Sequence, residues 1–421
     1  MLYSIKNIIW GPHTLLLILI LGTTLIIKTH ARALSHPIKV FKSTIFSINS
    51  NKSAFKSMCT ALGGTIGVGN TVGVAAAIYE GGAGALFWML VAGLLGITIK
   101  EAEIFLAVKY KPTFSKYSGP MYYIEKGVGS KVFAKLWCIS CIFTSLGMGN
   151  ASQSMAVTTS LKETFGIEKY ISAILLCIIV FIILTGGGER IKSFSSAVIP
   201  YLTLLFVLFS IVILFVQRSN LPSAISEIFK SSLNVHSGVS GFKWASFCSA
   251  VRIGFSRGIF TNEAGLGSAS IVHSSSGEND SEKQAMWGIV EVFIDTIVIC
   301  FLTGLVILTS NTNTTSVEKI TLSIFESTFG SVGSIFYTVS MLFFAIASIV
   351  AWFFYANCSL DYIKANKTVK KSFLSLFIIT VFIGGVFRSH EIIITSDIFN
   401  GIMLLLNSCA LFLLSGSAKN K

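Results

Sequence analysis

The chain has 421 residues, of which 53% are hydrophobic and 12% charged, with a mean hydropathy of +0.76 and a formal net charge of +13. Soluble domains carry roughly a quarter of charged residues, so this composition excludes an ordinary soluble enzyme or binding module. It predicts a protein built from many membrane-spanning helices.

Apolar runs of about 20 residues, the length that crosses roughly 30 Å of hydrocarbon, recur along the whole chain. The first predicts an N-terminal helix near 8–27, and ten more follow near 55–79, 85–108, 135–160, 170–186, 193–216, 244–273, 285–309, 331–357, 372–387 and 395–415. We number these ten expected helices 1 to 10. The expected fold class is therefore an all-α polytopic membrane protein with about 11 transmembrane helices.

These runs also divide the chain. We expect an N-terminal helix with a basic cytoplasmic segment (1–54), a first five-helix unit (55–217), an extracellular or periplasmic connection (218–243), a second five-helix unit (244–415) and a cytoplasmic tail (416–421).

The basic residues sort by loop, which predicts the orientation. With the segment after the first helix placed in the cytoplasm, that side carries 21 of the 32 Lys and Arg and the opposite side carries 8. The positive-inside rule then places the N-terminus outside and the C-terminus inside. It also accounts for the positive net charge without a nucleic-acid partner. A cleaved signal peptide ending near 31–33 is the alternative for the first helix, but its basic flank would lie on the wrong side.

Expected helix 1 contains more glycine than a uniform helix tolerates, because each glycine costs about 1 kcal/mol relative to alanine. Close helix packing would place such glycines on one face, whereas these fall on several faces: Gly63, Gly64, Gly67, Gly69 and Gly73. A break near 66–70 would free N–H groups for a carboxylate and carbonyls for a cation. Thr65 and Asn70 lie beside it.

Expected helix 6 has a counterpart, the segment 260–263, flanked by glycines at 254, 258, 265 and 267. Two interrupted helices at corresponding positions in two halves are typical of a mid-membrane substrate site. Burying the charged side chains of Arg257 and Glu263 in an apolar segment costs free energy unless they are paired or hydrated. Glu263 is expected either to pin the break or to contact substrate.

Polar groups in three other expected helices are further candidates. Gln153 in helix 3 offers a donor and an acceptor to an amino acid, or it joins two helices. Glu291 and Asp295 in helix 7 lie one turn apart, which fits a proton relay or pairing with a basic residue. Lys100 and Glu103 in helix 2 are expected near the cytoplasmic end, where long side chains reach water.

Enzyme motifs are missing from the sequence: there is no H-E-x-x-H, no Walker loop and no G-x-S-x-G elbow. We therefore expect a protein that is not an enzyme, binds no cofactor and hydrolyses no ATP.

Seven sequence motifs resemble the alanine or glycine:cation symporter family, the sodium:alanine symporters. The motifs are Trp10-Gly-Pro12, the runs 64–70, 81–88, 106–110 and 119–123, Gly149-Asn150 with Gln153, and the run 257–269. The resemblance implies an N-terminal helix and two inverted five-helix repeats with broken helices 1 and 6, as in the leucine transporter. It also implies sodium-coupled symport of small neutral amino acids by alternating access in the bacterial inner membrane, with lipid, sodium and the amino acid as partners.

Carried over by position, the resemblance implies a substrate shell and an ion site. The substrate shell would comprise Thr65, Gly67, Gly69, Asn70, Gln153, Phe260, Thr261 and Asn262. The sodium site would comprise the backbone carbonyls of Gly64 and Ile66 and the hydroxyl of Ser348.

The sequence departs from the family pattern at Val68, Ala83, Ala351, Ala356, Asn357 and Leu406. The departures concern ion coupling and substrate preference more than the fold. The alternatives are a proton-coupled or uncoupled transporter of the same fold, and a channel-like or degraded membrane protein.

Overall fold

The computed structural model describes residues 2–29, 32–233, 241–310, 316–387 and 390–417, and within these ranges every regular element is helical. The expected first helix is two helices, α1 (Leu2–Ile9) and α2 (Pro12–Lys28). They meet at Trp10 and Gly11 because Pro12, which lacks an N–H and disfavours helix in the residue before it, begins α2. The basic segment that follows forms α3 (Arg32–Ser35), α4 (Pro37–Ser43) and a short 3₁₀ turn, η1 (Ile45–Ser50).

Helices lie at all of the expected positions in the first half, and π-helical turns interrupt two of them, expected helices 1 and 3. They are α5 (Lys52–Thr65), η2 (Gly69–Gly73), α6 (Val74–Gly81), α7 (Gly84–Lys109), α8 (Pro120–Tyr123), η3 (Ile124–Val128), α9 (Lys131–Leu146), η4 (Gly147–Ala151), α10 (Ser152–Phe165), α11 (Lys169–Thr185) and α12 (Gly187–Val216). The connection expected at 218–243 contains a further helix, α13 (Leu221–Leu233), and its residues 234–240 lie outside the described ranges.

The second half repeats this pattern, with an interruption in expected helix 6. Its elements are α14 (Gly241–Asn262), α15 (Ser268–Ser274), α16 (Ser281–Val292), η5 (Phe293–Cys300), α17 (Phe301–Thr309), η6 (Val317–Lys319), α18 (Ile320–Phe329), α19 (Ser331–Tyr362), α20 (Lys367–Val386) and α21 (His390–Leu414). In the tail, residues 418–421 lie outside the described ranges.

By length and composition, seven helices in the described ranges can cross a membrane, and the bent pair α5 with η2–α6 adds an eighth. These helices confirm an all-helical, multi-pass membrane protein. The count of eleven spans and the arrangement of two inverted repeats stay predictions.

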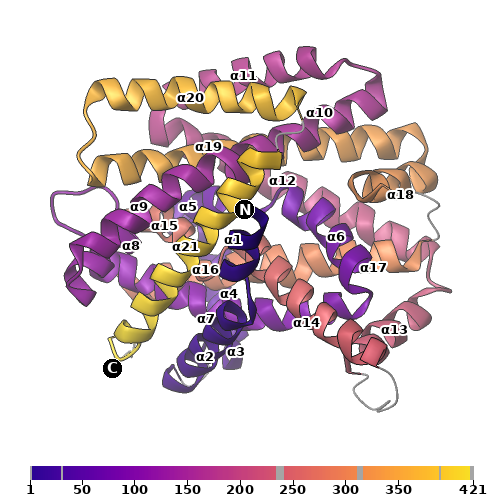
Figure 1. Ribbon diagram of the computed structural model, residues 1–421, viewed down its shortest axis with the longest axis horizontal. Coiled ribbons are helices and arrows are strands. Elements are labelled where there is room, and N and C mark those ends of the chain that lie inside the picture. Colours follow the sequence, from indigo (N-terminus) through magenta and orange to yellow (C-terminus); the bar gives the residue numbers. More distant parts are fainter. Residues whose placement is uncertain (1, 30–31, 234–240, 311–315, 388–389, 418–421) are drawn as a thin grey trace.

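The interrupted segments lie inside the molecule because glycines allow close packing around them. α14 packs along α7, and a Cβ at Gly254 would lie 2.2 Å from the carbonyl oxygen of Ala85. α5 packs against α12 and α19, whereas α11 and α20 lie side by side at the edge of the helical assembly (Figure 1). Many large apolar side chains of α11 and α12 are exposed, as expected for a surface that faces lipid.

Candidate functional site

The break in expected helix 1 lies at residues 66–68, where the sequence predicts it. α5 ends at Thr65, Ile66 is extended, and the two arms of the helix are bent by 53°. The N–H groups freed at the break are bonded by side chains: Gly67 N donates to Asn70 Oδ1 (3.1 Å) and Val68 N donates to Gln153 Oε1 (3.2 Å). Two of the predicted site residues therefore hold the break itself.

Asn70 also connects this break to expected helix 7. Its Nδ2 donates to Asp295 Oδ1 (2.7 Å), and Asp295 Oδ2 accepts from the Thr296 hydroxyl (2.8 Å). That hydroxyl in turn accepts from Asn262 Nδ2 at the break in helix 6 (3.2 Å). Asp295 and Thr296 thus join the two breaks. The sequence singled out Asp295 as a candidate for a proton relay or for pairing with a basic residue, but it gave no signal for Thr296 and did not predict the bond to Asn70.

The break in expected helix 6 lies just after the segment that the sequence singled out. α14 stays helical to Asn262, so the 260–262 segment forms its last turn, and the interruption covers 263–267. Glu263, Gly265 and Gly267 have φ values of 55°, 93° and 81°. Glycine adopts this left-handed region freely, whereas glutamate does so only when other contacts hold it.

The contacts of Glu263 fit the pinning role. Its Oε1 accepts from Trp352 Nε1 (3.0 Å) and its Oε2 accepts from the Ser268 hydroxyl (2.5 Å), so it ties the break to α19 and to the start of α15. Arg257, the other costly charge in this segment, lies instead 3.7 Å from Glu80 of α6.

A cavity of about 520 Å³ reaches the break in helix 1 and the last turn of α14, just before the break in helix 6. Four of the predicted substrate residues line it: Gly69, Gln153, Phe260 and Thr261. The other four, Thr65, Gly67, Asn70 and Asn262, are not among its described lining residues. The hydroxyl of Thr65 donates to Leu62 O within α5 (3.1 Å).

Charged residues and the N-terminal helices form the rest of the cavity wall. Lys6 of α1 pairs with Asp397 of α21 (2.6 Å), and Arg252 and the Arg257–Glu80 pair lie nearby in the same wall. Trp10 stacks on Phe260 with ring centroids 4.3 Å apart, and its Nε1 donates to Asp397 O (2.9 Å). The α1–α2 bend therefore contributes directly to the cavity.

The predicted ion ligands lie where the end of α5 contacts α19, and none of them is among the described lining residues of the cavity. The Ser348 hydroxyl, which is fully buried on α19, donates to Gly64 O (3.0 Å). These two oxygens are adjacent, and Ile66 is buried at the break two residues further on.

The expectation that Lys100 and Glu103 reach water is wrong, because both are fully buried. Lys100 Nζ lies 3.4 Å from Glu291 Oε1, and Glu103 Oε1 accepts from Gly265 N and from Asn407 Nδ2, both at 2.8 Å. Polar groups from three distant segments therefore contact the two side chains inside the protein.

Two lysines donate hydrogen bonds to backbone carbonyls at the C-terminal end of α15, which is not part of the described cavity lining. Lys111 Nζ donates to Ser274 O (2.7 Å) and Lys192 Nζ donates to Ser275 O (2.9 Å). Burial, and secondarily the charge of Lys192, lower the pKa of Lys111 from its usual value. Cations are favourable at a helix C-terminus, so these contacts stabilise the end of α15.

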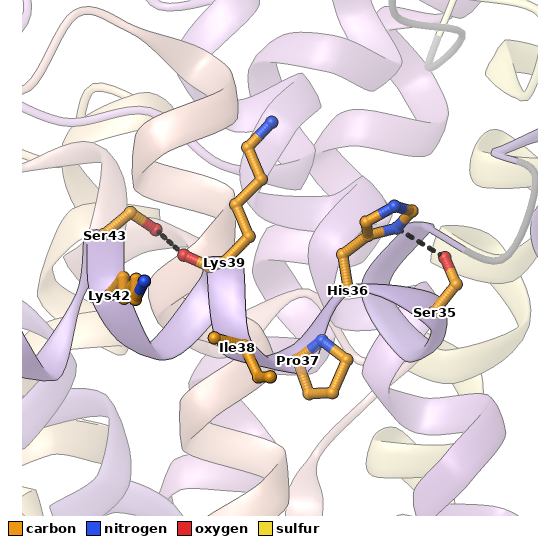
Figure 2. Close-up of a pocket in the computed structure, with 7 residues that line it drawn as sticks. All are labelled: Ser35, His36, Pro37, Ile38, Lys39, Lys42 and Ser43. Carbon is orange, nitrogen blue, oxygen red and sulfur yellow. Dashed lines mark hydrogen bonds between the residues drawn. The ribbon is translucent and has the colours of Figure 1, made fainter.

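A second hollow, of about 590 Å³, lies away from the breaks. Figure 2 shows that its seven lining residues come from one short stretch around α4, 35–43, and that the hydrogen bonds among these seven join neighbours such as Ser43 Oγ and Lys39 O (2.9 Å). Its lining brings no distant elements together, so we place the candidate site at the breaks.

Comparisons with known proteins relate the chain to a family and to a fold. A family model described as "Sodium:alanine symporter family" matches residues 1–421. The chain is 35% identical to an uncharacterized transporter of Haemophilus influenzae, over 97% of this chain and 92% of that protein. It is 29% identical to the sodium/alanine symporter AgcS of Methanococcus maripaludis, over 98% and 94%. The crystal structure of MhsT in complex with L-phenylalanine is similar in fold, with a TM-score of 0.63, 16% identity, and 85% and 88% of the two chains covered.

Proposed function

Because the chain belongs to the sodium:alanine symporter family, we propose that it couples the uptake of a small neutral amino acid, alanine or glycine, to the entry of sodium. It is a transporter and not an enzyme, as its family consists of symporters. Transport would follow alternating access, in which one side of a central site opens at a time.

The observation that carries this proposal is a cavity that reaches two broken helices joined by one hydrogen-bonded chain. Phe260 and Thr261 would bound the substrate on the helix 6 side, and Gly69 and Gln153 on the helix 1 side. Gln153 can exchange its bond to Val68 N for a bond to the substrate. The four predicted residues that do not line the cavity would fix the shape of the breaks without contacting the substrate. They are Thr65, Gly67, Asn70 and Asn262.

For sodium we propose Gly64 O, Ile66 O and the Ser348 hydroxyl. A hard cation favours oxygen ligands, and carbonyls at a helix break supply them without a net charge. The adjacency of Ser348 Oγ and Gly64 O supports this set, since the ion would replace the hydrogen bond between them.

We further propose that the protein lies in the bacterial inner membrane with its N-terminus outside and its C-terminus in the cytoplasm. The loop charges support this orientation. The cavity, which is lined by Lys6 and Glu80, would then open outwards, and the lysines that bond α15 would close the cytoplasmic side.

The test is uptake of radiolabelled alanine into proteoliposomes under an inward sodium gradient, an inward proton gradient, or neither. We expect saturable uptake that requires sodium. Uptake driven by the proton gradient alone would support proton coupling, and uptake without saturation would indicate a channel. Absence of both binding and uptake would identify a degraded transporter.

A further inference from the structure

A group of buried ionisable residues lies on the side of the helix 6 break away from the cavity. Lys100 and Glu103 come from α7, Glu263 from the break and Glu291 from α16, and each is at most 1% exposed. None of the four lines the 520 Å³ cavity. Their role is therefore separate from direct contact with the substrate.

The charge of Lys100 is matched by Glu291. Besides Lys100, Glu291 contacts His273, whose Nε2 lies 2.8 Å from Glu291 Oε2. His273 Nδ1 faces the amide nitrogen of Gln284 (2.9 Å), and Gln284 Oε1 accepts from Ser276 (2.8 Å). In this network Nδ1 accepts, so Nε2 carries the proton and donates to Glu291. With a hydrogen bond from His273 on Oε2 and the ammonium group of Lys100 3.4 Å from Oε1, Glu291 is the ionised partner of Lys100.

Two carboxyl groups remain, and one of them has an oxygen without a hydrogen bond. Both oxygens of Glu263 accept hydrogen bonds, from Trp352 and Ser268. Glu103 receives both of its donors on Oε1, and Oε2 has no hydrogen-bond partner in the part of the chain that the structure describes. A buried carboxylate that lacks a counter-charge is neutralised by taking up a proton.

We propose that Glu103 is a proton-binding site that controls the helix 6 break. Its Oε1 holds Gly265 N, and Asn407 bonds both Glu103 Oε1 and Gly265 O, so the charge of Glu103 acts directly on the break. A carboxylate accepts stronger hydrogen bonds than a neutral carboxyl group. Protonation of Glu103 on Oε2 therefore loosens the break that follows Phe260 and Thr261.

The ionisable groups around Glu103 set the background for this titration. The groups that act on Glu103 are Lys100 on its own helix, Glu291 of α16 and Tyr123 of α8, whereas α21 contributes the uncharged Asn407. Lys100 and Glu291 interact in turn with Glu263 at the break, His273 of α15 and Asp295 of η5.

This inference rests on the proposed function, so its test measures alanine binding directly. Purified wild-type protein and Glu103→Gln are titrated with radiolabelled alanine at saturating sodium, at acidic, neutral and alkaline pH. Glutamine keeps the Oε1 acceptor and is permanently neutral. We expect the wild type to lose about tenfold in affinity from alkaline to acidic pH, because bonds to a charged acceptor contribute about twice as much as neutral ones. Glu103→Gln should bind weakly at every pH.

Two further variants keep the result decisive. Glu227→Gln removes an exposed carboxylate on α13 and should keep the wild-type pH profile. Glu103→Asp keeps a titratable group and should keep a pH dependence with a shifted midpoint, which tests the site even if Glu103→Gln does not fold. Wild-type affinity that is independent of pH, or a Glu103→Gln profile equal to the wild type, would overturn the inference. Absence of alanine binding by the wild type at any pH would instead contradict the proposed function.

Discussion

Replacing Asn70 with alanine tests whether the break in helix 1 is held by its own side chains. Asn70 is 1% exposed, accepts from Gly67 N at 3.1 Å, and donates to Asp295 Oδ1 at 2.7 Å and to Asp295 O at 3.2 Å. Alanine removes the acceptor of the Gly67 N–H and the donor to Asp295 Oδ1, while Asp295 Oδ2 keeps its bond from Thr296. A buried polar group that loses its partner costs about 1–3 kcal/mol, so we expect a loss of about 2–4 kcal/mol in stability.

The same substitution should also weaken alanine binding, because Gly67 N and Asp295 fix the geometry on either side of the cavity wall. We expect a loss of roughly ten- to hundredfold in affinity, which corresponds to about 1.4–2.7 kcal/mol. The assays are thermal unfolding of the purified protein in detergent and equilibrium binding of radiolabelled alanine at saturating sodium.

Asn150→Ala is the matched control. Asn150 is equally buried, and its Nδ2 donates to a single backbone carbonyl, Phe377 O, at 2.8 Å, away from both breaks. It should lower stability by about 1 kcal/mol and leave alanine affinity unchanged. If Asn70→Ala unfolds at the wild-type temperature and binds alanine normally, the break does not depend on these bonds and the reasoning is refuted.

Substitutions at four further residues test other parts of the site. Gly67→Ala places a methyl carbon 2.7 Å from Gln153 Oε1, so this variant and Gln153→Ala should each reduce alanine affinity about tenfold. In the double variant the two losses in binding free energy should be less than additive. Additive losses would show that the two residues act separately. Ser348→Ala should raise the sodium concentration for half-maximal uptake about fivefold, and Ser348→Thr should keep the wild-type value. If Ser348→Ala has an unaltered sodium dependence but a poorer alanine affinity, Ser348 belongs to the substrate pocket and not to the ion site. Trp10→Ala removes the stacking on Phe260, which contributes about 0.5–1.5 kcal/mol, so the KM for alanine uptake should rise severalfold. Trp10→Phe should largely keep the wild-type KM. Equal kinetics in the wild type and both variants would contradict a role for the stacking.

The helices and the breaks could be predicted because their signals are local. Apolar runs set the helix positions, and glycines at several faces of one helix predict the interruption at 66–68. The position of the second break was less certain from the sequence. The 260–262 segment stays helical because the positive φ values begin only at Glu263, and the glycines that permit them follow at 265 and 267.

The partners of buried polar groups could not be predicted, since they come from distant helices. From the sequence alone, Lys100 is expected to extend to water. The structure shows that it is buried instead, with Glu291 at a distance of 3.4 Å. In the same way, the role of Asp295 depends on Asn70, which is 225 positions earlier in the chain. Local sequence patterns carry no information about such pairs.

The size of the cavity has a pharmacological consequence. At about 520 Å³ it lies in the range of pockets that hold drug-sized ligands, so it has room for a molecule far larger than alanine. An amino-acid analogue with a bulky aromatic extension could place its zwitterionic end near Gln153 and its ring against Trp10. Such a compound would fill the cavity between Trp10 of α1 and Gln153 of α10, and it would therefore compete with alanine for the same space.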